Sequence, residues 1–214
     1  MVDVASDRNK LYEPLNWQGN FRFPRMVRLR TVADGSCFFH AIANAFFVPY
    51  RTGELKGKPV SRSELIRGLR HDLSVKLGAK PDAKSLAPYD LLSRGQLKDL
   101  SKTLPQFGLA KMQAQLDSSD HVDNTYNEFI SNELNKDIYL LDLAKQDVYM
   151  TGNDDEILYK GRESIVILYM PNHYELVGLL HENDPRTVDT LFQPGHEFIQ
   201  TLRRRMAELR APRH

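Results

Sequence analysis

The only cysteine of the chain, Cys37, stands where a short turn runs directly into an apolar segment. The turn has the sequence Asp-Gly-Ser-Cys, and Gly35 lets its backbone curl tightly. A thiol at the start of a helix meets backbone N–H groups without an intrahelical partner and the positive end of the helix dipole. Both favour the thiolate, so we expect the pKa of Cys37 to lie below that of a free thiol. The same N–H groups could hold the oxyanion of a tetrahedral intermediate.

A cysteine nucleophile also needs a general base, and His173 is the best placed of the seven histidines. It follows the turn Pro171-Asn172 and opens an apolar segment, 174–180. Strand alternation puts His173 and Glu175 on one face, where the carboxylate can fix one ring nitrogen and leave the other to face the sulfur. The plain alternatives are a small buried hydrophobic cysteine and an ordinary turn histidine.

Together the two segments resemble the two signature boxes of the ovarian-tumour (OTU) family of cysteine proteases. The sequence Asp-Gly-Ser-Cys-Phe-Phe-His-Ala-Ile at 34–42 is similar to the cysteine box, in which an Asp-Gly-x-Cys turn enters a buried helix. Asn-His-Tyr-Glu at 172–175 resembles the histidine box, in which an aromatic residue and then a polar or acidic residue follow the histidine. From about residue 27 to residue 180 the chain follows the family's order of nucleophile helix, helical arm and sheet.

The resemblance implies a deubiquitinating thiol hydrolase that cleaves isopeptide bonds at the C-terminus of ubiquitin or of a ubiquitin-like modifier. Cys37 is then the nucleophile, His173 the base and Glu175 the orienting residue. The backbone of Asp34, Gly35, Ser36 and Cys37 lines the oxyanion hole. Tyr174 walls the channel for the terminal Gly-Gly of ubiquitin, together with Phe38 and Asn172.

The resemblance also implies partners and absences. We expect a monomer that binds ubiquitin and polyubiquitin chains, without a cofactor, a metal, a nucleic acid or a membrane. The alternative is a catalytically weak module that keeps the OTU fold and only binds ubiquitin. A third interpretation, a basic-tailed nucleic-acid or scaffold protein, leaves the Asp-Gly-Ser-Cys turn unexplained.

Two departures from the family pattern concern the orienting residue and a missing tryptophan. The position usually holds Asp or Asn, and the longer Glu175 leaves Asp34 or Asn172 open as the catalytic acid. Many members carry Trp-Gly between arm and sheet, whereas the only tryptophan here is Trp17. The segment 129–141 instead looks similar to OTU proteins of large DNA viruses.

The elements that must position these residues follow from the apolar periodicity. Residues 1–26 form a lead-in that we expect to pack on the body through Trp17, Phe21 and Phe23, and 26–32 has the alternation of a strand. Residues 37–47 are apolar on nearly all sides and predict a buried helix, which Pro49 ends. We expect residues 27–214 to form a single OTU-like catalytic domain.

The rest of the chain predicts a helical arm, a sheet and a closing helix. In the arm, 60–135, helical patterns cover 61–77 with a capping box, 86–104, 110–116 and 125–134. In the sheet, 136–180, short apolar runs at 138–141, 147–150, 157–159, 164–170 and 174–180 alternate with turn signals. An amphipathic helix closes the chain at 196–210. The class is α+β, a papain-type cysteine protease fold in which a small, mainly antiparallel sheet packs between the nucleophile helix and the arm.

Composition and rival motifs exclude several other functions. The net charge of +1 disfavours a whole-surface grip on nucleic acid or on an anionic membrane. A single cysteine excludes an intrachain disulfide, and no signal-peptide core or spanning segment is present, so we expect a cytoplasmic protein, in the host cytoplasm if it is viral. The chain has no phosphate-binding loop, no His-Glu-x-x-His and no Gly-x-Ser-x-Gly. The arginines at 203–205 are expected on the solvated face of a structural helix, and the acidic run 154–156 at a hairpin tip, with contact to the basic tail of ubiquitin as its alternative.

Overall fold

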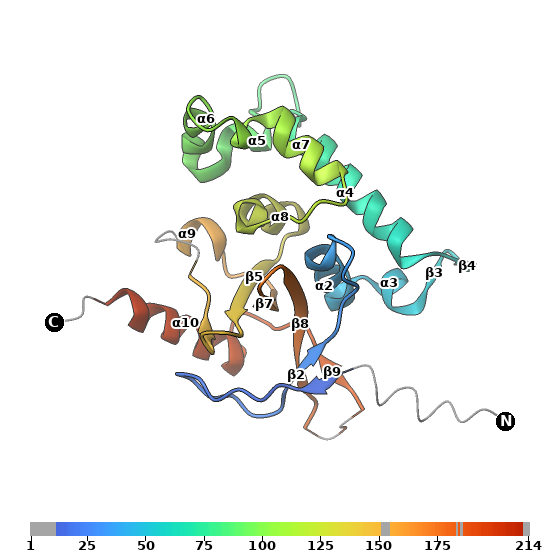
Figure 1. Cartoon of the computed structure of the whole chain (residues 1–214), viewed down its shortest axis with the longest axis vertical. Helices are drawn as coiled ribbons and strands as arrows, with labels where there is room; N and C mark the ends of the chain where they lie inside the picture. Colours follow the sequence, from blue (N-terminus) through green and yellow to red (C-terminus); the bar gives the residue numbers. More distant parts are fainter. Residues whose placement is uncertain (1–11, 151–154, 183, 185, 212–214) are drawn as a thin grey trace.

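A mixed sheet forms the centre of the described part of the chain, which in this computed structural model comprises residues 12–150, 155–182, 184 and 186–211 (Figure 1). The strands lie in the order β1-β2-β8-β7-β5-β6, and β9 also pairs with β8. Their bounds are Glu13–Pro14 (β1), Met26–Leu29 (β2), Asp137–Asp142 (β5), Asp147–Val148 (β6), Ser164–Met170 (β7), His173–Leu180 (β8) and Val188–Asp189 (β9). β5 and β7 run parallel, and the other neighbouring strands run antiparallel.

The central strands are apolar on both faces because helices cover both faces of the sheet. Along β7, Ile165 and Ile167 belong to one core cluster, whereas Val166 and Leu168 belong to the other. This two-residue alternation between two dry clusters explains a nearly continuous apolar run. The sequence therefore predicted these strands but could not assign a solvent face to them.

Helix α2 (Cys37–Phe46) packs on β8 and β7, and helix α10 (Glu197–Arg210) lies on the opposite face of the sheet (Figure 1). The helical arm shares its core cluster with α2, so both lie on the same side. The α+β class is confirmed. One detail of the predicted arrangement differs, because the closing helix, rather than the arm, covers the face opposite the nucleophile helix.

The arm consists of two longer helices, several short ones and α8, which joins the arm to the sheet (Figure 1). Ser61 and Glu64 form the predicted capping box at the start of α4, and α4 packs along α7. The bounds are Val48–Thr52 (α3), Arg62–Gly78 (α4), Pro88–Leu91 (α5), Leu92–Gly95 (η1), Gln96–Leu100 (α6), Pro105–Phe107 (η2), Leu109–Asp117 (α7), Asn124–Tyr126 (η3) and Asn127–Leu134 (α8). A small hairpin of β3 (Glu54–Leu55) and β4 (Lys58–Pro59) links α3 to α4.

Two predicted elements need correction. The helical pattern at 86–104 is broken, because Ser93, Arg94 and Gly95 all have positive φ angles, of 51°, 55° and 85°. The apolar run 157–159, predicted as a strand, overlaps the short helix α9 (Asp155–Leu158). Tyr159, just after that helix, stacks on Tyr139 with ring centroids 4.3 Å apart. A three-residue apolar run cannot distinguish one helical turn from a short strand.

The lead-in contacts the face of the sheet that α10 covers. Trp17 and Phe21 are buried in that cluster, and the partly buried Phe23 stacks on Phe198 with centroids 4.8 Å apart. Residues 1–11 and 212–214 lie outside the described residues, and so does Asp154. Asp155 and Glu156, predicted at a hairpin tip, begin the helix α9 instead. The division of the chain at residue 26 stays a prediction. Within the described residues, no helix is both long and apolar enough to cross a bilayer.

Candidate active site

Cys37 is the first residue of α2, and the turn that leads to it is held in a conformation that favours glycine. Gly35 has a φ angle of +80°, and a Cβ atom added there would come within 1.9 Å of the carbonyl oxygen of Ser119. Ser36, the residue before the helix, makes no side-chain capping bond to the first turn. Gly35 is therefore required both by its own backbone and by the close approach of the segment around Ser119.

Asp34 is fixed to the turn and to a buried histidine. Its Oδ1 accepts from the backbone N–H of Ser36 at 3.0 Å, and its Oδ2 lies 3.0 Å from Nε2 of His40. Nδ1 of His40 lies 2.7 Å from the hydroxyl of Tyr50, so the tautomer with Nε2–H satisfies both contacts. Burial acts to raise the pKa of Asp34, but the bonds from His40 and from the Ser36 amide outweigh it and lower that pKa.

His173 begins β8, after the left-handed residue Asn172, whose φ angle is 60°. Nε2 of His173 lies 3.8 Å from Oε1 of Glu175 and 3.4 Å from the hydroxyl oxygen of Thr31. The predicted pairing of imidazole and carboxylate on one face of the strand is therefore present in the structure. In the part of the chain that is described, neither Asp34 nor Asn172 forms a hydrogen bond with His173.

Thr31 is a site residue that the sequence alone did not single out. Its hydroxyl donates to the carbonyl oxygen of Tyr174, so its oxygen can accept from Nε2–H of His173. Glu175 is buried, and its second oxygen, Oε2, has no hydrogen-bond partner among the described residues. That oxygen lies 3.6 Å from Nη1 of Arg28, which in turn bonds Glu13. Glu175 thus stands between an imidazole and a guanidinium.

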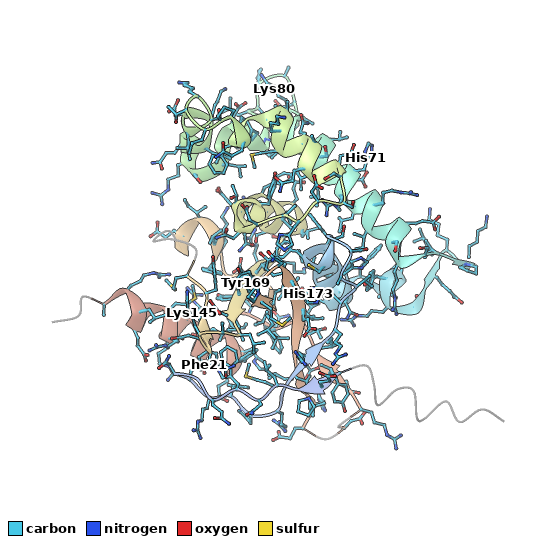
Figure 2. All side chains as sticks on the ribbon, in the orientation of Figure 1. Phe21, His71, Lys80, Lys145, Tyr169 and His173 are labelled. Carbon is cyan, nitrogen blue, oxygen red and sulfur yellow. The ribbon has the colours of Figure 1, made fainter. Side chains whose placement is uncertain are left out.

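The two predicted segments meet because α2 packs against β8. The backbone N–H of Tyr174, the residue after His173, acts to lower the pKa of the Cys37 thiol, and the rings of Phe38 and Tyr174 lie 5.2 Å apart. Figure 2 shows His173 beside α2, close to Tyr169 in this view. No hydrogen bond joins Cys37 to His173 within the described residues. The structure therefore brings the predicted nucleophile and the predicted base onto two packed elements, α2 and β8.

The expectation of a lowered cysteine pKa is wrong for this resting structure. Cys37 is only 2% exposed, and this burial raises the pKa of its thiol. Hydrogen bonds from the backbone N–H groups of Tyr174, Phe38 and Cys37 act in the opposite direction without overcoming burial, and the charge of Asp34 raises the pKa further. The sequence correctly placed the thiol at the N–H groups that begin α2, but it gave no measure of how far the thiol is shielded from water.

The same contacts refine the predicted oxyanion hole. Within the turn, the N–H of Ser36 already donates to Asp34. The backbone N–H groups of Cys37, Phe38 and Tyr174 act to lower the pKa of the Cys37 thiol, and they belong to two different elements, α2 and β8. Phe38 and Tyr174 thus add donors that the sequence had assigned only to the channel. The share of Gly35 and Asp34 in such a hole stays a prediction.

A cavity of about 220 Å³ adjoins the site on the other side of Tyr174. Asn172 and Tyr174 line it, as predicted for a substrate channel, whereas Phe38 packs edge-on against Tyr174 and is not among the lining residues. His121 stacks on the Tyr174 ring at 5.3 Å. The full lining is His121, Asp123, Asn124, Leu140, Tyr149, Tyr169, Asn172 and Tyr174. Within the described residues no cluster of three His, Cys, Asp or Glu side chains could hold a metal ion.

Comparison with known proteins finds similarity only among solved structures. No protein-family model matches the sequence, and no curated protein matches it. OTU domains are among these structures. An OTU domain in complex with ubiquitin aligns over 94% of this chain and 92% of its own at 16% identity, with a TM-score of 0.49. An OTU deubiquitinase from Wolbachia pipientis wMel aligns over 73% of this chain and 90% of its own at 12% identity, with a TM-score of 0.43. The Hazara virus OTU bound to ubiquitin aligns over 78% of this chain and 97% of its own at 13% identity, with a TM-score of 0.36.

Proposed function

We propose that this chain is a thiol hydrolase of the OTU type that cleaves isopeptide bonds at the C-terminus of ubiquitin. One observation carries the proposal. The backbone N–H of Tyr174 acts to lower the pKa of the thiol at the start of α2, and Tyr174 directly follows a histidine whose Nε2 faces Glu175 and Thr31. A thiol near an oriented imidazole is the arrangement that nucleophilic cysteine catalysis requires. The two segments are also those that resemble the OTU boxes.

The geometry supports a different role for each ring nitrogen of His173. Nε2 faces Glu175 and Thr31, so Nδ1 is the nitrogen that takes the proton of Cys37. The sulfur then attacks the terminal carbonyl of ubiquitin, and the electron pair of the C=O bond moves to the oxygen, which backbone N–H groups hold. Collapse of this intermediate expels the lysine amine, which takes the proton from His173. Water then hydrolyses the thioester by the same route and regenerates the thiol.

The cavity beside Tyr174 supports the same proposal. Tyr174, which contacts the first turn of α2 through Phe38, lines it, and tyrosine rings and the Asp123 carboxylate are among its lining groups. Such a lining suits an extended peptide that carries aliphatic and basic side chains. In the proposed function, the tail of ubiquitin lies along this lining with its last residue at Cys37.

A second candidate function is a ubiquitin-binding module without turnover. The observation that favours it is the buried thiol, whose pKa lies above its ordinary value in the resting protein. The two functions share the binding of ubiquitin and differ in whether the thiol can be deprotonated.

Cleavage of diubiquitin tests the proposal. Each lysine-linked diubiquitin and the linear form are incubated with the wild type and with Cys37→Ala, and ubiquitin binding by both is measured by titration. We expect cleavage of at least one linkage by the wild type, and binding without cleavage by Cys37→Ala. If the wild type and Cys37→Ala both bind ubiquitin and neither cleaves it, the chain is a ubiquitin-binding module. If neither protein binds ubiquitin, both functions are contradicted.

A further inference from the structure

Arg70 is a buried arginine on α4 that reaches the turn before Cys37. It is 2% exposed. Its Nη1 donates to the hydroxyl of Ser36 at 2.9 Å and lies 3.5 Å from the carbonyl oxygen of Gly35. Its guanidinium carbon lies 4.7 Å above the ring of Phe39, the third residue of α2. One side of the guanidinium therefore touches the turn at residues 34–37, called here the nucleophile turn, and the first turn of α2.

The other side of the guanidinium binds the end of α7. Nε donates to the carbonyl oxygen of Leu116 at 2.9 Å, and Nη2 donates to those of Gln115 at 2.7 Å and Asp120 at 2.8 Å. The last carbonyls of a helix lack intrahelical partners and carry the negative end of its dipole, so a cation is stabilised there. Within the described residues, no carboxylate forms an ion pair with Arg70. Burial lowers the pKa of Arg70, but a guanidinium stays charged in proteins.

These contacts make the nucleophile turn and the segment after α7 one unit. The segment approaches the turn so closely that a Cβ atom on Gly35 would meet the carbonyl oxygen of Ser119 at 1.9 Å. Two backbone segments in such contact need a fixed spacing, and the guanidinium bridges them with donors in a rigid plane. A lysine ammonium has three donors at one point and cannot span the same acceptors.

We propose that Arg70 is a positioning residue for the acyl-transfer step. It holds the carbonyl of Gly35 and the hydroxyl of Ser36, and it thereby fixes the direction of the backbone N–H groups at the start of α2, where the oxyanion forms. This inference rests on the proposed thiol chemistry, but it does not require ubiquitin as the substrate. It predicts that the loss of Arg70 slows reactions that form an oxyanion more than reactions of the same thiol that form none.

The test compares two reactions of Cys37 in Arg70→Lys. Transfer of the acetyl group of p-nitrophenyl acetate to the sulfur passes through an oxyanion, whereas alkylation by iodoacetamide displaces iodide and forms none. Hydrolysis of ubiquitin with a C-terminal fluorogenic amide is measured alongside, and Cys37→Ala gives the background. Arg162→Lys is the matched control, because Arg162 is a largely buried arginine that bonds the carbonyl oxygens of Ser131 and Leu158 at the opposite end of β7.

We expect Arg70→Lys to lower kcat for acyl transfer about 30-fold, because small misplacements of positioned groups are costly. Alkylation should stay within about threefold of the wild type, since its transition state makes no demand on the turn. Arg162→Lys should lose thermal stability and leave both reactions within about twofold. An equal fall of alkylation and acyl transfer in Arg70→Lys would overturn the proposal.

A second variant covers the case in which Arg70→Lys does not fold. Ser36→Ala removes only one acceptor of Arg70, and we expect it to lower acyl transfer a few-fold and alkylation not at all. Unchanged acyl transfer in Ser36→Ala, or in a folded Arg70→Lys, would contradict the positioning role. Hydrolysis of the ester but not of the ubiquitin amide by the wild type would remove the proposed function and still decide the role of Arg70. Failure of the wild type on both substrates would remove both.

Discussion

The two helices on opposite faces of the sheet, α2 and α10, begin in opposite ways. α10 has a side-chain cap, because Nδ1 of His196 accepts from the N–H of Phe198, and Glu197 stands in its first turn and Arg210 in its last. α2 has no side-chain cap, no acidic residue in its first turn and no basic residue in its last. The N–H groups of Cys37 and Phe38 at the start of α2 act instead on the Cys37 thiol, whose pKa they act to lower.

This difference separates a helix that stabilises the fold from a helix that presents a reactive group. A cap satisfies the first N–H groups and favours folding. A helix that offers those groups to a thiol and then to an oxyanion gives up that stabilisation, and other contacts must hold its start. In α2 those contacts come from Asp34 with His40, and from Arg70. Substitutions at α2 and at the histidine should therefore change rates, and substitutions at α10 should change stability.

The largest expected effect is the loss of the nucleophile or the base. We expect Cys37→Ser and His173→Ala to lower kcat on diubiquitin at least ~1,000-fold, since a hydroxyl is far less acidic than a thiol and no other base is in place. Both should keep the wild-type melting temperature within a few degrees. His71→Ala is the control, because His71 is exposed on α4 and pairs with Asp117 (Figure 2). Residual turnover within tenfold of the wild type in either variant would contradict the assignment of Cys37 as nucleophile or of His173 as base.

The next effect concerns the two residues that face Nε2 of His173. Glu175→Ala should lower kcat/KM by about 10- to 100-fold, or roughly 1.4–2.7 kcal/mol of transition-state stabilisation. Glu175→Gln should be milder if orientation matters most, because an amide oxygen still accepts from the ring N–H.

Thr31→Val should lower kcat/KM about fivefold, because it removes one acceptor for the imidazole of His173. Thr52→Val is its control, since the Thr52 hydroxyl also donates to a backbone carbonyl, that of Val48, but on an exposed helix. If Glu175→Ala and Thr31→Val both leave the kinetics unchanged, the role passes to Asp34 or Asn172.

A third effect is the pH dependence of the thiol itself. Burial raises the pKa of Cys37, so the thiolate, and with it the rate of alkylation, should appear only above the ordinary thiol value of about 8.5. Iodoacetamide labelling against pH measures this directly, because the chain has a single cysteine. His173→Ala should leave the midpoint nearly unchanged, as no hydrogen bond joins the two side chains in the described residues. A midpoint near neutral pH in the wild type would show an ion pair that this structure lacks.

A smaller effect is expected where α10 is anchored to the sheet. Arg205 donates to both carboxylate oxygens of Asp147, at 2.9 and 2.6 Å. Burial acts to raise the pKa of Asp147, but the bonds from Arg205 and from the N–H of Val148 outweigh it, and the pKa of Asp147 is lowered. We expect Arg205→Ala to lower the free energy of unfolding by about 2 kcal/mol near neutral pH, with unchanged kcat.

The sign of the pH dependence follows from the lowered pKa of Asp147. Its stabilisation is complete above the unfolded value of about 3.9 and is lost as the pH falls through the lower folded value. The gap between wild type and Arg205→Ala should therefore close in strong acid. Arg204→Ala is the exposed neighbour for comparison. A gap that stays constant down to strong acid would show that the loss comes from packing alone.

The smallest effect is the loss of the α10 cap. We expect His196→Ala to lower the free energy of unfolding by about 1 kcal/mol, because the side chain satisfies one N–H group of the first turn. Denaturant unfolding measures the loss, and kcat should not change. A fall in kcat without a fall in stability would contradict the division between the two helices.

The sequence predicted those parts of the fold that depend on local chemistry. The buried helix at Cys37, the capping box at Ser61 and the hairpin that begins β8 at His173 all follow from turn residues and periodicity, and all are present. The parallel pairing of β5 with β7 depends on a crossover, which no local pattern reveals. The helix α9 was missed because its apolar run is too short to show a period.

The candidate site could be predicted only for residues in a recognisable motif. Cys37, His173 and Glu175 belong to two such segments, and packing of α2 on β8 brings those segments together. Thr31 and Arg70 come from other elements and reach the site through tertiary contacts. Arginine side chains are mostly exposed in proteins, whereas the structure buries Arg70 on the same face of α4 as Ile66 and Leu73. The raised pKa of Cys37 was missed for the same reason, because burial is a property of the assembled core.

The most direct test of the proposed thiol hydrolase is covalent capture by ubiquitin that carries a C-terminal propargylamide. Intact-mass spectrometry of the mixture shows whether one ubiquitin is added, and peptide mapping shows where. We predict an adduct of one ubiquitin per chain on Cys37 in the wild type, none in Cys37→Ala, and strongly slowed capture in His173→Ala. A wild-type chain that binds this ubiquitin and stays unmodified would contradict the account.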